Sequence, residues 1–140
     1  MARMDDGFAT TISFPSHASI KFYEKTVTPP GVSGEGAIDT TTMQNTAYRT
    51  RKPKSLKTLT DSSVTVAYDP AVYPEILAII NDNQLITITY PDTSTLKFYG
   101  WVDSFVPGAQ TEGEQPTAEV SIICSNQTDV GVETAPVWAS

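Results

Sequence analysis

The residues of this chain that could perform catalysis are few and lie far apart in the sequence. His17 is the only histidine and Cys124 is the only cysteine. A site of several histidine ligands is therefore impossible, and a nucleophile would have to recruit His17 from a polar segment that carries no orienting motif. Glu112 and Glu114 form a carboxylate pair, but they lie in a Gly- and Pro-containing loop that offers no environment for acid–base work.

Two further motifs suggest binding sites but lack the spacing that such sites need. Residues 31–36 read GVSGEG, which fits neither a phosphate-binding loop nor a nucleophile elbow. The Asn-Asp-Asn triplet at 81–83 lacks the spacing and terminal Glu of an EF-hand, so a helix C-cap is its expected role. We therefore expect no enzyme, and no catalytic residue, cofactor-binding residue or metal ligand.

The composition is that of a folded domain that works in water. A chain of 140 residues with 39% apolar and 18% charged residues suits one domain, and a domain of this size buries roughly 68% of its unfolded surface. The net charge of −7 disfavours ordinary nucleic-acid binding, which needs clustered Lys and Arg. No run approaches the ~20 apolar residues of a membrane span, and the N-terminal sequence lacks a signal-peptide pattern, so we expect no membrane contact.

The hydrophobic pattern predicts a mainly β fold with one helix. Apolar residues alternate with polar ones in five segments, at 19–28, 63–68, 84–90, 96–105 and 117–125. A helix is expected over 71–81, with Asp69 as its N-cap and Pro70 at its first position. Its apolar face is expected to comprise Val72, Ile76, Ile79 and Ile80. Cys124 shares a strand face with apolar residues, which indicates a small buried hydrophobe rather than a reactive thiol.

The remaining segments are predicted to be arms and a long loop of a single domain, residues 1–140. We expect an N-terminal arm at 1–18, an extended loop at 40–60 and a C-terminal arm at 127–140. A loop this long is unusual in a compact domain and is often functional. It carries a basic cluster, namely Arg49, Arg51, Lys52, Lys54 and Lys57. After Lys97 the chain has acidic residues but no basic ones.

The order of these elements resembles the tail tube (major tail) proteins of long-tailed bacteriophages, the lambda-like family. The similarity is best from Ser62 to Asn126, and its more specific parts are FYGW at 98–101 and EQPT at 114–117. The resemblance implies a β-sandwich flanked by one α-helix, with six copies closing into a ring around a β-barrel lumen. Stacked rings would form a conduit through which DNA passes without specific binding. A tail terminator that does not stack, or another ring-forming tail or baseplate β-sandwich, is the alternative.

The same resemblance implies partners and a location. The chain would assemble with itself in the host bacterial cytoplasm and remain in the virion tail. A tape measure protein, a tail terminator and distal tail proteins would be its other partners.

The charge pattern leads to two hypotheses about assembly, and one glycine leads to a third. First, acidic residues are expected to line the lumen and repel DNA phosphates, the candidates being Glu24, Asp103 and Glu119. Second, the basic cluster is expected to contact Glu112 and Glu114 of a neighbouring subunit and so stack the rings. In both cases the alternative is an ordinary solvated charge. Third, Gly100 lies within a predicted strand, which indicates a bulge or a close backbone approach.

Overall fold

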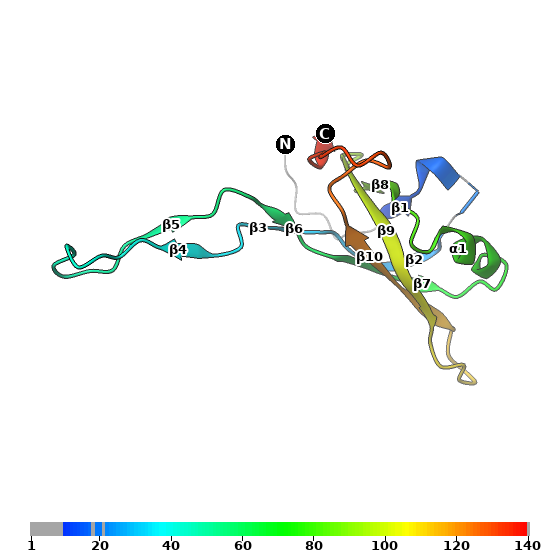
Figure 1. The fold of residues 1–140 in the computed structure, drawn as a ribbon. Coiled ribbons are helices and arrows are strands. Elements are labelled where there is room, and N and C mark those ends of the chain that lie inside the picture. The colour runs from blue at the N-terminus through cyan, green and yellow to red at the C-terminus, as the bar shows by residue number, and fades with distance from the viewer. Residues whose placement is uncertain (1–9, 18, 21, 140) are drawn as a thin grey trace.

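The body of the molecule is built on one curled antiparallel sheet (Figure 1). The computed structural model describes residues 10–17, 19–20 and 22–139. In spatial order the main strands are β1 (Thr11–Ser13), β8 (Gln84–Thr89), β9 (Thr95–Pro107), β10 (Thr117–Cys124), β7 (Ser62–Ala67) and β2 (Glu24–Thr28). A seventh strand, β11 (Val137–Ala139), pairs with β9 beyond the end of β10. The expected mainly β fold with one helix is confirmed.

The sheet curls until its two edge strands approach each other. The backbone N–H of Ile12 in β1 donates to Oε1 of Glu24 in β2 across 3.2 Å. One curled sheet therefore supplies both layers of the core. The buried side chains include Phe14, Val64, Val66, Ile76, Ile79, Ile86, Ile88, Phe98, Val102, Val120 and Ile122.

Two short strands occur in the segments that the sequence predicted as arms. β1 pairs with β8, and its Ile12 is buried together with the following Phe14. β11 pairs with β9 and exposes Trp138, whose ring lies 5.3 Å from that of Tyr90. Residues 1–9 and 18 of the expected N-terminal arm lie outside the described residues. Three-residue strands carry too little alternation to be recognised, because distant pairing partners select them.

The predicted strand at 19–28 is shorter in the structure, where β2 begins only at Glu24. Phe14 leads into a 3-10 turn, η1 (Pro15–His17), in which the His17 N–H donates to the Phe14 carbonyl oxygen at 2.8 Å. Ile20 is buried without ladder pairing. The alternating pattern thus identified the buried side chains, but not the backbone conformation, over the first part of this segment.

The helix α1 (Tyr73–Ile79) begins later than predicted. Asp69 does not cap it, because Oδ1 of Asp69 accepts a hydrogen bond from the Ala71 N–H at 3.0 Å and closes a separate turn. Val72 occupies the N-cap position and Pro74 lies in the first turn, where its missing N–H costs little. Of the predicted apolar face, Ile76 and Ile79 are fully buried and Val72 and Ile80 are partly buried. The helix packs beside β9 through this face.

A long two-stranded arm, residues 29–61, projects from the body (Figure 1). Near the body, β3 (Val32–Ser33) pairs with β6 (Thr58–Leu59); farther out, β4 (Ala37–Asp39) pairs with β5 (Arg51–Pro53). Between these ladders, residues 34–36 on one strand face residues 54–57 on the other. About 16 residues on each side give a reach of at most roughly 50 Å at ~3.3 Å per residue. The predicted loop at 40–60 is the tip and one side of this arm.

Gly100 lies where no side chain fits, as the sequence predicted. It pairs with Cys124 of β10 and Gln84 of β8, and a Cβ atom at this position would collide with the Ile123 carbonyl oxygen. A Gly100→Ala change is therefore expected to lower the free energy of unfolding by about 1–3 kcal/mol, the usual cost of overpacking. Urea denaturation followed by circular dichroism measures this loss.

The matched control for that substitution is Gly34→Ala. Gly34 lies in the arm, has open space where a Cβ would sit and needs no left-handed backbone conformation. The urea midpoint of the Gly34→Ala variant should equal that of the unmodified protein within experimental error. Equal midpoints for both variants would contradict the close approach at Gly100.

Candidate assembly surfaces

The tip of the arm is held in shape by side-chain hydrogen bonds. The Thr41 N–H donates to Oδ1 of Asp39 at 2.9 Å, and the Thr50 N–H donates to the Thr41 hydroxyl at 3.0 Å. Nδ2 of Asn45 donates to the Tyr48 carbonyl oxygen at 2.8 Å. Short Thr, Asn and Asp side chains replace ladder hydrogen bonds in turns of this kind. The tip is therefore already built in the single subunit.

One ion pair also joins the two strands of the arm. Nη1 of Arg49 lies 3.1 Å from Oδ2 of Asp39. Hydrogen bonds from Thr41, and to a smaller extent from Arg49, hold the pKa of Asp39 below its ordinary value of 3.8. Because the pKa of Asp39 is lower in the folded state, the ionised carboxylate stabilises the tip when the pH is above the ordinary pKa of 3.8. This contribution is lost as the pH falls through the folded-state pKa. The pair is exposed and so contributes little.

The basic cluster does not form one compact patch. Arg51 and Lys52 lie in β5, where successive side chains alternate between the two faces of the arm. Arg49 is at the tip, whereas Lys57 is near the body beside Leu56. The cluster therefore spreads along about 26 Å of one strand, and we call it the basic strip.

The arm also exposes apolar side chains. Met43 is 99% exposed and Tyr48 is 86% exposed, and both lie at the tip. Others follow along the arm, namely Val32, Ile38 and Leu56. Large apolar side chains exposed along one projecting arm make the arm a candidate interaction surface. The sequence analysis missed this feature, although large apolar residues within a polar loop were its visible signal.

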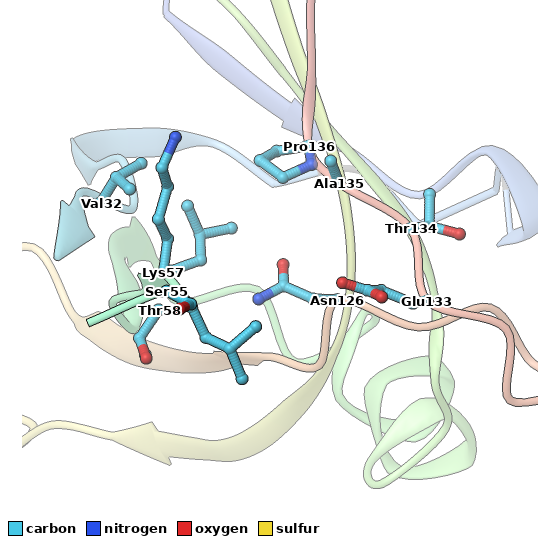
Figure 2. A pocket seen from close by; sticks show the side chains of 11 residues that line it. Val32, Ser55, Lys57, Thr58, Asn126, Glu133, Thr134, Ala135 and Pro136 are labelled. Atoms are coloured by element: carbon cyan, nitrogen blue, oxygen red, sulfur yellow. The ribbon is translucent and has the colours of Figure 1, made fainter. Parts of the chain in front are cut away.

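A groove of about 420 Å³ lies at the root of the arm (Figure 2). One wall comes from the arm, including Val32, Leu56 and Leu59, and the opposite wall comes from residues 133–136. The Asn126 side chain extends between them (Figure 2). No sequence motif indicated this groove, because its two walls lie more than 70 residues apart in the chain.

The acidic loop between β9 and β10, residues 108–116, lies far from the arm in the same subunit (Figure 1). Glu112 and Glu114 are exposed there. The base of the loop is closed by a hydrogen bond from the Gly108 N–H to the Thr117 carbonyl oxygen at 2.8 Å. The structure therefore does not bring the basic strip and the acidic loop together within one chain.

The three lumen candidates do not share one face of the sheet. Asp103 is the extra residue of a bulge in β9, and it is exposed. Glu119 is exposed on β10, opposite Thr65. Glu24 instead pairs with buried Val66, because a register shift separates it from the rest of β2. A one-residue shift moves a side chain to the other face, and the sequence pattern does not reveal it.

The face that carries Glu119 is rich in hydroxyl groups. Cross-strand pairing places Glu119 beside Thr65, and Ser121 beside both Ser63 and Ser104. Thr26 extends this row into β2, where it pairs with Thr65. A continuous polar surface therefore runs across β2, β7, β10 and β9, and we call it the polar face.

The two residue types most suited to chemistry are held in structural contacts. Nδ1 of His17 lies 3.0 Å from Oε1 of buried Gln84, so the half-buried His17 ring is in contact with the sheet. Sγ of Cys124 donates to the Thr60 carbonyl oxygen at 3.4 Å. Within the described residues, no three His, Cys, Asp or Glu side chains gather where they could hold a metal ion. Nor is any described helix long and apolar enough to cross a membrane.

Cys124 should resist thiol reagents in the folded protein. Burial, with a smaller contribution from the charge of Asp61, raises the pKa of the Cys124 thiol from 9.0 to about 12. Since each pKa unit lowers the thiolate fraction tenfold, native labelling by a maleimide at pH 8 should be about 1,000-fold slower than that of a free thiol. Mass spectrometry over a time course measures the rate. Labelling in urea is the control, and equally fast native labelling would contradict the raised pKa of this partly buried thiol.

The fold is similar to that of chains in two solved structures of gene transfer agent particles. One solved structure, the virion of a native gene transfer agent particle, contains a chain that superposes with a TM-score of 0.68 at 12% identity, covering 98% of this chain and 100% of that one. Another, the tail of an empty gene transfer agent particle refined with C6 symmetry, gives a TM-score of 0.58 at 10% identity over 85% of this chain and 84% of that one. No family model matches the sequence, and no curated protein is similar to it in sequence.

Proposed function

We propose that this chain is a structural, non-catalytic subunit of a phage-type tail tube. Six copies close into a ring, and rings stack into a hollow conduit for genome delivery into a host. The fold likeness to a virion chain over its whole length supports this proposal, and one similar structure is a tail with six-fold symmetry. The chain would then reside in the virion tail after assembly in the bacterial cytoplasm. A tape measure protein, a tail terminator and distal tail proteins would be its further partners.

The arm is the observation that carries the proposal. Ordering a backbone costs about 1–2 kcal/mol per residue, yet Met43, Tyr48 and Leu56 of the arm remain exposed in the single subunit. The hydrogen bonds of the arm offset part of this cost, and burying those side chains against a partner would offset more. A head-to-tail contact between different surfaces of identical chains propagates without limit, which is the geometry that a tube needs.

Charge complementarity suggests one of the contacts between rings. The basic strip and the acidic loop lie apart in one subunit but carry opposite charges. We expect the basic strip of one subunit to contact Glu112 and Glu114 of another. Each exposed ion pair contributes only about 0–1 kcal/mol, but repetition around a ring multiplies the effect on orientation and register.

We further propose that the polar face lines the channel. Glu119 is an exposed carboxylate on this face and Asp103 is exposed at the neighbouring bulge in β9, whereas Glu24 is held at the opposite face by its pairing with Val66. An acidic wall repels DNA phosphates over about 8 Å at physiological salt, so DNA passes without specific binding. A cryo-electron microscopy structure of the tube should therefore give a negative lumen potential. A neutral or positive lumen would refute this part of the proposal.

Negative-stain electron microscopy of the purified protein tests the proposed function. Long hollow tubes with six-fold rings are expected. Isolated rings without tubes would instead favour a tail terminator or another single-ring tail protein. Monomers at every concentration, with no ring or tube, would refute the proposal.

A shortened chain supplies the matched control. Ser33 and Thr58 are directly paired, so residues 34–57 can be replaced by an Asn-Gly turn without disturbing the ladder below them. This variant should keep the circular dichroism spectrum of a folded β protein and form no tubes. Normal tubes from the shortened chain would exclude the arm as the stacking element.

A further inference from the structure

The groove at the root of the arm contains a polar atom that lacks a partner. Oδ1 of Asn126 is buried and accepts no hydrogen bond within the described part of the chain. The residue cannot easily turn away, because its backbone is left-handed (φ 56°) and its carbonyl oxygen accepts the Thr134 N–H at 2.8 Å. Buried acceptors are almost always satisfied in folded proteins. This acceptor is therefore unsatisfied in the single subunit.

The walls of the groove indicate what the donor should be attached to. Leu56 and Val32 are 76% and 65% exposed on the arm side, and Ala135 and Pro136 form part of the opposite wall (Figure 2). A flat apolar group with a hydroxyl at its end would fill the space between these walls and reach Asn126. Tyrosine has this combination.

The arm tip presents such a group. Tyr48 is exposed, and its carbonyl oxygen is fixed by Nδ2 of Asn45, so its position at the tip is defined. Arg49 follows it directly, and Glu133 at the groove makes no ion pair with another described residue. Arg49 is, however, already paired with Asp39, and Lys57 as well as Glu133 lines the groove, so the match between tip and groove is one of shape.

We infer that the arm tip of one subunit docks into the groove of a second copy, where the Tyr48 ring packs between the walls and its hydroxyl donates to Oδ1 of Asn126. Eight residues of the arm, roughly 26 Å, separate Tyr48 from Leu56 at the groove, so the contact forms between chains. This inference rests on the proposed function. The groove is a different surface from the acidic loop, so each contact can be tested separately.

Disulfide trapping in assembled protein tests the docking. In a Cys124→Ser background, Tyr48→Cys and Ala135→Cys are introduced together, and tubes are oxidised and run on a non-reducing gel. A ladder of covalent dimers, trimers and longer chains is expected. The matched control pairs Ala135→Cys with Tyr23→Cys, which is 67% exposed on the body, and it should give no ladder. Tubes that give no ladder from the first pair would overturn the docking and leave the proposed function standing.

A double-mutant cycle covers the case in which Tyr48→Cys prevents assembly. Tyr48→Phe removes only the hydroxyl, and Asn126→Gly removes the acceptor while tolerating the left-handed backbone. Each single variant should raise the critical concentration for tube formation about tenfold, and the double variant little further, because both remove one hydrogen bond. Additive effects, or no effect, would overturn the inference. Failure of the unmodified chain to form any ring or tube would overturn the proposed function as well.

Discussion

Reversing Arg49, Arg51 and Lys52 to Glu should leave a folded protein that forms no tubes. The three side chains are exposed on the outer part of the arm, so the body and its core are untouched. If the proposed contact forms, the change turns an attraction to a neighbour's acidic loop into a repulsion that is repeated at every copy, so the contacts are weakened together. Circular dichroism tests the fold and sedimentation velocity tests assembly. Normal tubes from this variant would show that the basic strip does not stack the rings.

A charge-swapped variant distinguishes the acidic loop from other partners. If Glu112 and Glu114 are also changed to Lys, the reversed basic strip meets a complementary surface again. Tubes should then reappear, at least in part. Tube formation by the reversed strip with Glu112 and Glu114 intact, or no tube formation when both are changed to Lys, would point to a different partner surface. Glu133 at the groove would be the next candidate.

The largest expected loss of stability comes from Phe98→Ala. Phe98 lies in the first part of β9 with 1% of its surface exposed, and it belongs to the apolar cluster of the curled sheet. Truncating a buried Phe costs about 3–5 kcal/mol, through lost transfer energy and the cavity left behind. Since domains of this kind are stable by about 5–15 kcal/mol, much of the fold's stability should disappear. Urea unfolding measures the change.

Val106→Ala is the control for that loss. Val106 lies in the same strand but is 56% exposed on the polar face, so its truncation should change the unfolding free energy by no more than about 0.5 kcal/mol. A similar loss for both variants would contradict the assignment of the two faces of β9. Comparing the pair thus tests the fold independently of assembly.

The parts of the fold that the sequence predicted are those with long, regular patterns. β8, β9 and β10 each carry at least six residues with continuous alternation, and the helix face shows clearly through Ile76 and Ile79. The pattern failed where a distant partner decides the structure. β1 is a strand only because β8 offers an edge for it, and Asp69 bonds within a turn because its side chain reaches the second N–H after it.

The candidate surfaces divide in the same way. Charge is visible in a sequence, so the basic cluster and the acidic loop could be named before their positions were known. The face on which a carboxylate lies depends on every register shift before it, so Glu24 could not be assigned from alternation alone. The groove forms where Asn126 and residues 133–136 lie against the arm, and no pattern in either segment predicts this contact. Surfaces made by distant segments require coordinates.

The interruption between the two ladders of the arm has a mechanical consequence. Three residues on one strand face four on the other, and Glu35 and Gly36 there have positive φ values of 63° and 89°. Hydrogen-bonded ladders resist bending, so we expect the arm to bend at this unpaired stretch rather than within the ladders on either side of it. A filament linked through such arms can curve by flexing every such stretch slightly, while the contacts at root and tip keep their geometry.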